Sequence, residues 1–155
     1  MEPENINTEE YEEEARTALV CEDNDGTRGS ITAALEGLGY RVEAGAGADD
    51  TFEKLRFNRY DVIVINEKFG GSAEDNKVYK HLQFMPMSNR RHIFVALIGQ
   101  GLKTADNMTA FSKSANVVVN EQDIPNLKAI LKKSVADNDQ FYKVYKESLV
   151  KLGKR

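Results

Sequence analysis

The stretch YDVIVINEKFGG, residues 60–71, decides the fold of this chain. Its centre, residues 62–65, is a run of four β-branched aliphatic side chains, which makes a strand apolar on both faces. Such a strand has to be covered on both sides, as it is in a parallel sheet between two layers of helices. The run ends at Asn66. Because ligands and chemistry in open α/β sheets lie at the carboxyl ends of the strands, the functional site is expected near this amide.

Apolar segments and helical patterns alternate along the rest of the chain. Strands are predicted at residues 17–21, 40–44, 61–65, 93–98 and 117–119. Helices are predicted at residues 27–38, from an N-cap at Asp49-Asp50-Thr51, around 77–84, at 104–114, and from Pro125 onward. This alternation predicts βαβ units and one parallel sheet with helices on both faces. The fold class is therefore α/β, and the size fits a doubly wound five-stranded sheet of order 2-1-3-4-5.

Composition excludes several classes of protein. The 155 residues are 41% hydrophobic and 30% charged, which is typical of a globular domain with a real core. No apolar run is long enough to span a membrane, and the acidic N-terminus does not resemble a signal peptide. The single cysteine, Cys21, excludes an internal disulfide and a multi-cysteine metal site. We expect a cytoplasmic protein with no membrane partner.

Charge is distributed unevenly along the chain. Residues 1–16 hold seven Glu and one Arg, a balance of −6, so the other 139 residues carry +2 of the net −4. The nearly neutral remainder has no basic field that would favour nucleic acid. Residues 1–16 contain too few apolar side chains to offset their ordering entropy, and they are predicted to form a flexible acidic tail.

Two local features resemble response-regulator receiver domains of the CheY-like type. The acidic pair Glu22-Asp23 follows the first predicted strand at once. The string YDVIVIN, residues 60–66, resembles the receiver strand that carries the phosphoacceptor. The resemblance covers residues 17–135, and it implies the flavodoxin-like strand order.

The resemblance assigns a role to each matching position. In receivers the acidic pair holds Mg²⁺, which falls on Glu22 and Asp23 here. The acceptor aspartate ends the third strand, where this chain has Asn66. A phosphoryl-binding hydroxyl ends the fourth strand, and Leu97 or Ile98 matches it. In receivers a lysine ends the fifth strand, and this chain has Asn120 at that position. An aromatic switch residue lies in the same strand, at the position of Val117 here.

These differences argue against conventional phosphorylation. An acyl phosphate needs a carboxylate nucleophile, and Asn66 is an amide. The cation that neutralises transferred phosphate is missing at Asn120. The resemblance therefore implies a non-enzymatic pseudo-receiver that signals by binding protein partners, through the face made by the fourth helix, the fifth strand and the fifth helix. A weak Mg²⁺ or Ca²⁺ site at Glu22 and Asp23 (with Asp25 nearby) stays open beside an acidic rim that holds no metal.

Two other functions stay open at this point. One is an atypical receiver that is phosphorylated on Glu67 or Asp23. The other is a small-ligand-binding domain that uses the crevice of the doubly wound sheet.

The chain is expected to divide into the acidic tail 1–16, a receiver-like domain 17–136 and a helical extension 137–155. The segment Asp137-Asn138-Asp139 is expected to break or kink the final helix. An isolated helix of this length is marginal in water, so the extension should dock on its own domain, on a second copy in a homodimer, or on a partner.

Overall fold

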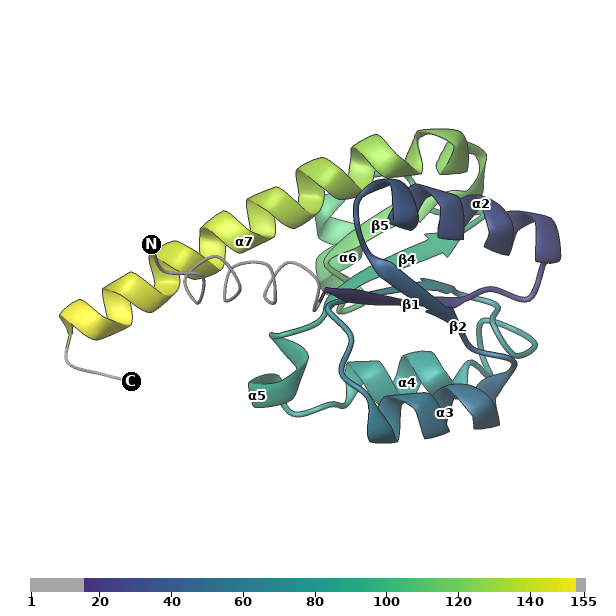
Figure 1. Cartoon of the computed structure of the whole chain (residues 1–155), viewed down its shortest axis with the longest axis horizontal. Coiled ribbons are helices and arrows are strands. Elements are labelled where there is room, and N and C mark those ends of the chain that lie inside the picture. The colour runs from purple at the N-terminus through teal and green to yellow at the C-terminus, as the bar shows by residue number, and fades with distance from the viewer. Residues whose placement is uncertain (1–15, 153–155) are drawn as a thin grey trace, which may run out of the picture.

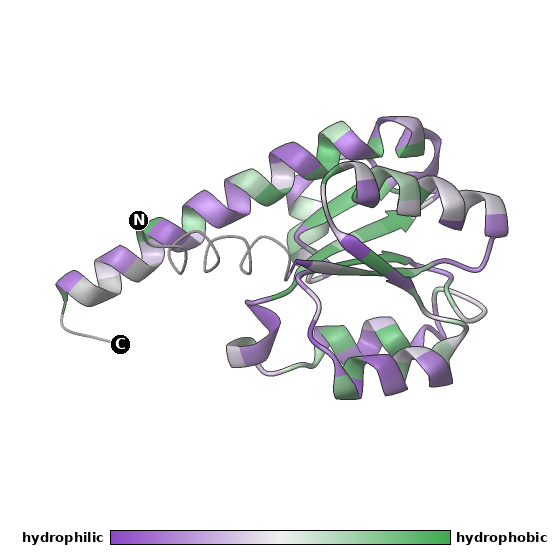
Figure 2. Cartoon of the chain, in the orientation of Figure 1, coloured by the Kyte–Doolittle hydropathy of each residue, from purple (hydrophilic) through white to green (hydrophobic). Residues whose placement is uncertain are grey.

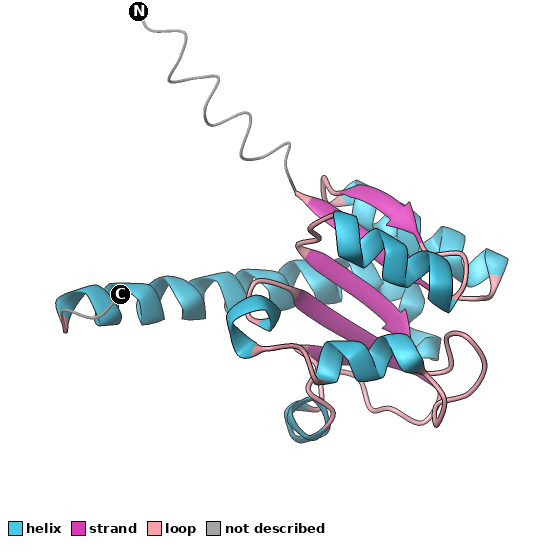
Figure 3. Ribbon diagram, turned by 90° about the horizontal axis from the view of Figure 1, so that it is seen from below, coloured by secondary structure: helices cyan, strands magenta, loops and turns pink. Residues whose placement is uncertain are grey.

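The centre of the protein is a five-stranded sheet in which all the neighbouring strands are parallel (Figures 1 and 3). The computed structural model describes residues 16–152, so the predicted tail, apart from Arg16, lies outside the described residues. The strand order is β2-β1-β3-β4-β5, as the sequence predicts. The strands are β1 Thr17–Cys21, β2 Arg41–Ala44, β3 Val62–Asn66, β4 Phe94–Gly99 and β5 Val117–Asn120.

Helices cover both faces of this sheet (Figure 1). The helix α2 Asp25–Gly37, the 3₁₀ helix η1 Glu121–Asn126 and the long helix α7 Leu127–Lys151 pack on one face. The other face carries α3 Ala48–Phe57, α4 Lys77–Gln83 and α6 Asn107–Ser112, and the short helix α5 Met87–Arg90 lies in the connection to β4.

The apolar run of β3 is explained by these two layers. Val62 and Val64 point into the core beneath α2 and α7, whereas Ile63 and Ile65 point into the core beneath α3, α4 and α6. All four are at most 1% exposed. In Figure 2 the apolar strands accordingly lie between helices whose outer surfaces are mostly hydrophilic. The predicted edge strand is confirmed as β2, which has a neighbouring strand, β1, on one side only.

Three helix boundaries differ from the prediction. The helix α3 begins at Ala48, with Gly47 as its N-cap, which is earlier than the predicted cap at 49–51. Asp50 lies inside the first turn and accepts a hydrogen bond from the Ala46 N–H at 2.8 Å. The helix predicted at 104–114 is shorter, since Ala105 and Ser114 at its two ends have positive φ angles of 65° and 62°. Pro125 lies inside η1 and does not begin α7.

The predicted break at Asp137-Asn138-Asp139 is wrong, because α7 is continuous over 25 residues. Each of the three side chains has a partner that the helical conformation allows. Asp137 pairs with Lys133 one turn earlier at 3.0 Å, Asn138 accepts from Asn116 at 3.4 Å, and Asp139 pairs with Arg16 at 3.4 Å.

The second half of α7 projects away from the sheet (Figure 1). We call residues 140–152 the overhang. Its exposed apolar side chains include Phe141, Val144, Tyr145 and Leu152, and Phe141 is 63% exposed. These side chains of the overhang are therefore not packed on its own domain, which was one of the three expected alternatives. Within residues 16–152, no helix combines the length and the apolar character that crossing a membrane requires.

Candidate functional site

The carboxyl edge of the sheet brings the ends of β1, β3, β4 and β5 together. The pairing register places Cys21 beside Ile65, Asn66 beside Ile98, and Gly99 beside Asn120. Residues that directly follow these strands therefore surround Asn66, as expected from the topology.

Asn66 is buried, and its amide is fully used within the protein. It is 7% exposed. Its Nδ2 donates to Glu22 Oε1 at 2.9 Å and to Glu121 Oε2 at 3.4 Å. Its Oδ1 accepts from the Lys68 N–H at 2.9 Å. The amide thus points its donor at two carboxylates and its acceptor at a backbone N–H, which is the arrangement that leaves no polar atom unpaired.

Glu22 is the one residue of the predicted acidic pair that contacts Asn66. Glu22 is 5% exposed, and its carboxylate also accepts from the Asn24 N–H at 3.1 Å. Asp23 turns instead toward the β3–α4 loop and accepts from the Gly70 N–H at 2.9 Å. Asp25 is held by Arg28, whose other amino group donates to the Glu22 carbonyl oxygen at 2.9 Å.

This arrangement fits a divalent metal poorly. Among residues 16–152, no group of three or more His, Cys, Asp or Glu side chains is arranged to hold a metal ion. Asn66 directs its amide nitrogen, which is not a metal ligand, at the two carboxylates of Glu22 and Glu121. Hard cations such as Mg²⁺ prefer oxygen ligands in near-octahedral geometry, which a donor N–H between the two acids interrupts.

Leu97 does not reach the pocket. It is buried in the core beneath α3, α4 and α6, and Ile98 is buried in the core on the opposite face. The strand continues to Gly99, so Gly99 is the residue at the carboxyl end of β4. A Cβ atom at Gly99 would collide with the carboxylate of Glu67, which fills the space that a side chain would take there.

Val117 and Asn120 have structural contacts in β5. Val117 is buried in the core beneath α2 and α7. Asn120 Nδ2 donates to the carbonyl oxygens of Gln100 at 3.0 Å and Leu102 at 2.7 Å, and its Oδ1 caps η1 by accepting from the Gln122 N–H at 2.8 Å. Asn120 therefore holds the loop after β4 in place, and it brings no charge to the pocket.

Two residues of this edge are absent from the sequence prediction. Glu121 follows β5 directly, as Glu22 follows β1, and an acidic residue at a strand end is a signal that would have identified it. Asn76 is 2% exposed, and its Nδ2 donates to the carbonyl oxygens of Asn66 and Glu67, both at 3.0 Å. Its Oδ1 caps α4 by accepting from the Tyr79 N–H at 2.9 Å. An Asn just before a helical pattern is the signal for such a cap.

Comparison with solved structures places this fold among receiver domains. A response regulator from Thermotoga maritima aligns with a TM-score of 0.61 over 79% of this chain and 98% of its own, at 16% identity. A CheY-like receiver domain protein from Methanospirillum hungatei aligns with a TM-score of 0.62 over 81% and 97%, at 15% identity. The chemotaxis response regulator CheY4 of Vibrio cholerae gives 0.55 over 75% and 98%, at 16% identity.

These similarities show the CheY-like receiver fold, as the sequence resemblance implies. No protein-family model and no curated protein matches the sequence. At 14–19% identity the alignments establish the arrangement of strands and helices and leave function to the residues themselves.

Proposed function

We propose that this chain is a non-catalytic pseudo-receiver, a signalling module that binds protein partners and is not phosphorylated at the usual position. The observation that carries the proposal is the hydrogen bond from Asn66 Nδ2 to Glu22 at 2.9 Å. A neutral donor occupies the position where a receiver needs an ionised nucleophile, and it is held there by the carboxylate that would otherwise bind a metal.

Two neighbouring positions support the same proposal. Glu67 places a carboxylate over Gly99, so negative charge lies where a phosphoryl oxygen would need a hydroxyl donor. The Asn120 side-chain amide donates hydrogen bonds to two backbone carbonyls, and it supplies no cation. Together these groups would repel a phosphoryl group and offer nothing that neutralises its charge.

The interaction surface that we propose is the face formed by α6, β5 and α7. Met108 and Phe111 lie one turn apart on α6, and they are 77% and 83% exposed. Two large apolar side chains exposed side by side on a short helix are typical of a surface that a partner covers. No nucleic acid or membrane is part of this proposal.

The decisive experiment is intact-mass spectrometry after treatment with acetyl phosphate and Mg²⁺, with a phosphorylatable receiver domain treated in parallel. We expect no added phosphoryl group on this chain. A stable phosphoryl adduct mapped to Asp23 or Glu67 would replace the proposal with the atypical receiver.

The proposed face is tested separately, by placing a photo-crosslinking amino acid at position 111 in cells that make this protein. A discrete protein adduct is expected there, and it should be absent when the same amino acid replaces the exposed Ser30 on α2, on the other side of the sheet. Equal labelling from both positions would count against this face.

A further inference from the structure

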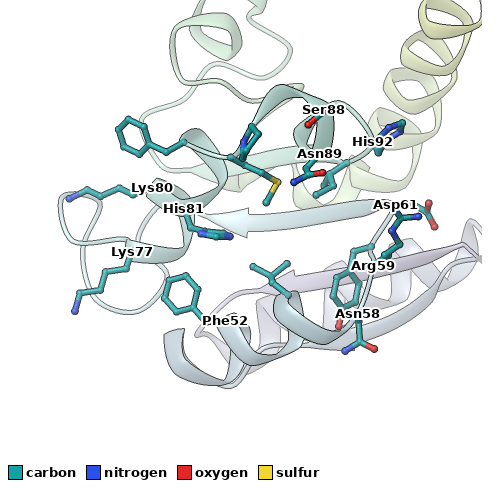
Figure 4. A pocket seen from close by; sticks show the side chains of 16 residues that line it. Phe52, Asn58, Arg59, Asp61, Lys77, Lys80, His81, Ser88, Asn89 and His92 are labelled. Atoms are coloured by element: carbon teal, nitrogen blue, oxygen red, sulfur yellow. The ribbon is translucent and has the colours of Figure 1, made fainter. Parts of the chain in front are cut away.

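A groove of about 980 Å³ runs along the side of the sheet that α3 and α4 cover (Figure 4). Its walls come from α3 and α4, and from the segment around α5 that leads to β4. Its floor includes Tyr60 and Asp61 just before β3, and Ile93 just before β4. Because the strands are parallel, Tyr60, Asp61 and Ile93 lie at the amino edge of the sheet. From there the groove runs between α3 and α4 to Lys77, the first residue of α4.

The rim of the groove is positively charged. Arg59, Lys77 and Lys80 line it, all three are exposed, and none of them forms an ion pair with another residue among 16–152. The one carboxylate in the lining is Asp61, which accepts a hydrogen bond from the Thr17 N–H at 2.8 Å. The rim therefore offers cationic side chains that are free to bind an anionic group.

One wall of the groove is apolar and aromatic. Phe52 meets the ring of His81 edge to face, with 5.6 Å between ring centroids, and the two side chains lie together in Figure 4. Phe84 also lines the groove and is 84% exposed. A cationic rim beside an exposed aromatic wall matches a peptide that carries both carboxylates and apolar side chains.

One segment of that composition begins next to the groove. Residues 1–15 hold seven Glu, no Lys and no Arg, together with Ile6 and Tyr11. The chain enters β1 at Thr17, whose N–H is bound by Asp61 and whose hydroxyl donates to the Arg59 carbonyl oxygen at 2.8 Å. Fifteen extended residues span about 50 Å. Residues 1–15 can therefore extend along a groove that begins next to the point where they join β1.

We propose that this groove binds an acidic peptide segment, and that its occupant is residues 1–15 of the same chain. Attachment at Thr17 makes the binding intramolecular, with an effective concentration in the millimolar range even for a weak contact. The carboxylates meet Arg59, Lys77 and Lys80, and the apolar side chains meet Phe52 and Phe84.

Paramagnetic NMR on the full-length chain tests the proposal. A spin label is attached to a Thr8→Cys variant, since Cys21 is fully buried and does not compete for the label. We expect broadening of amide signals around His81 and Phe84, and none at Asn120 and Glu121 after β5. Raising the ionic strength from about 0.1 M to about 1 M shortens the Debye length from about 10 Å to about 3 Å and should remove most of the broadening.

Matched charge reversals identify the binding surface. Lys77→Glu with Lys80→Glu should reduce the broadening at least about threefold, because two attractions become repulsions. Lys143→Glu with Lys151→Glu, on the overhang of α7, should leave it unchanged. Broadening centred on the overhang, broadening that disappears when labelled protein is diluted with unlabelled protein, or no broadening at all would each overturn the proposal. None of these outcomes depends on whether the chain is phosphorylated.

Discussion

At position 66, a single neutral amide donates hydrogen bonds to both carboxylates of the carboxyl-edge pocket. Asn66 Nδ2 lies within 3.4 Å of carboxylate oxygens from both Glu22 and Glu121. A carboxylate in the same place would put three acids in a largely buried site, where like charges repel strongly. The neutral amide of Asn66 avoids this repulsion and keeps a hydrogen bond to each of the two acids.

Asn66→Asp should therefore destabilise the protein at neutral pH, by about 2 kcal/mol in the free energy of unfolding. Mg²⁺ should recover part of this loss, since the new carboxylate supplies the ligand that the pocket lacks. Urea unfolding with and without Mg²⁺ measures both effects. Asn66→Ala is the control, because it loses the same hydrogen bonds and adds no charge. An equal response of the two variants to Mg²⁺ would contradict this account.

The sequence could predict some site residues and not others, for reasons that lie in individual contacts. Glu22 and Asn66 were predictable, because each ends or follows a strand whose pattern is clear. The predicted fourth strand ended at Ile98, one residue too early, since Gly99 gives no strand signal although it extends β4. Glu121 follows β5 directly, so its place at this edge was predictable as well, whereas its hydrogen bond with Asn66 joins residues 55 positions apart and no local pattern reveals it.

At the scale of elements, three of the helices begin with a side-chain N-cap. Asn24, Asn76 and Asp106 cap α2, α4 and α6 by accepting hydrogen bonds from N–H groups of the first turn. The caps differ in burial. Asn24 is exposed, whereas Asn76 is buried and also binds two carbonyl oxygens at the end of β3.

Asn76→Ala should accordingly cost about 2–3 kcal/mol, because it removes a buried cap together with the hydrogen bonds to the Asn66 and Glu67 carbonyl oxygens. Asn24→Ala removes only a cap and should cost about 1 kcal/mol. Chemical denaturation of the two variants provides the comparison. Similar losses from both would mean that the contacts of Asn76 with β3 contribute little.

The two halves of α7 should respond differently to disruption. Leu127 and Leu131 are fully buried against the sheet, whereas Phe141 and Leu152 of the overhang are 63% and 70% exposed. Proline in a helix interior costs about 3 kcal/mol or more. Lys132→Pro should therefore lower the thermal midpoint by many degrees. Ser148→Pro should reduce helical circular dichroism and leave that midpoint nearly unchanged. A large fall in the midpoint for Ser148→Pro would show that the overhang stabilises the folded domain.

The continuity of α7 shows what local patterns miss. Asp137, Asn138 and Asp139 are weak helix formers, and in isolation they favour a break. Their partners Asn116 and Arg16 lie 22 and 123 residues away along the chain. The parallel sheet between two helix layers, in contrast, follows from the apolar runs of β3 and β4, which consecutive residues show.

At the scale of the whole molecule, each of the two core layers contains buried tyrosines, Tyr40 in one and Tyr60 and Tyr79 in the other. Burial raises the pKa of Tyr40 and of Tyr60, and it raises the pKa of Tyr79 from 10.0 to about 12. Tyr60 donates to Glu43 Oε1 at 2.6 Å, and Tyr79 donates to the Lys113 carbonyl oxygen. The folded protein therefore keeps these protons at a pH where the unfolded chain loses them.

The free energy of unfolding should consequently fall as the pH rises from 10 toward 12. Below pH 10 the tyrosines are protonated in both states and have no effect on the pH dependence. Above it, the unfolded state gains by releasing protons first, and Tyr79 alone accounts for a loss on the order of 1 kcal/mol by pH 11. Urea titrations at several pH values measure this slope. Tyr79→Phe should make it shallower, and an unchanged slope would contradict the assignment.

The strand order also has a consequence for how the chain is made. As the ribosome releases this protein, β2 can pair with β1 first, and β3 then joins the other side of β1. Each later strand is added to that same growing edge, β4 beside β3 and β5 beside β4. No strand has to insert between two that are already paired. Assembly can therefore follow synthesis from the amino end, with the long helix α7 closing the last face after β5 is in place.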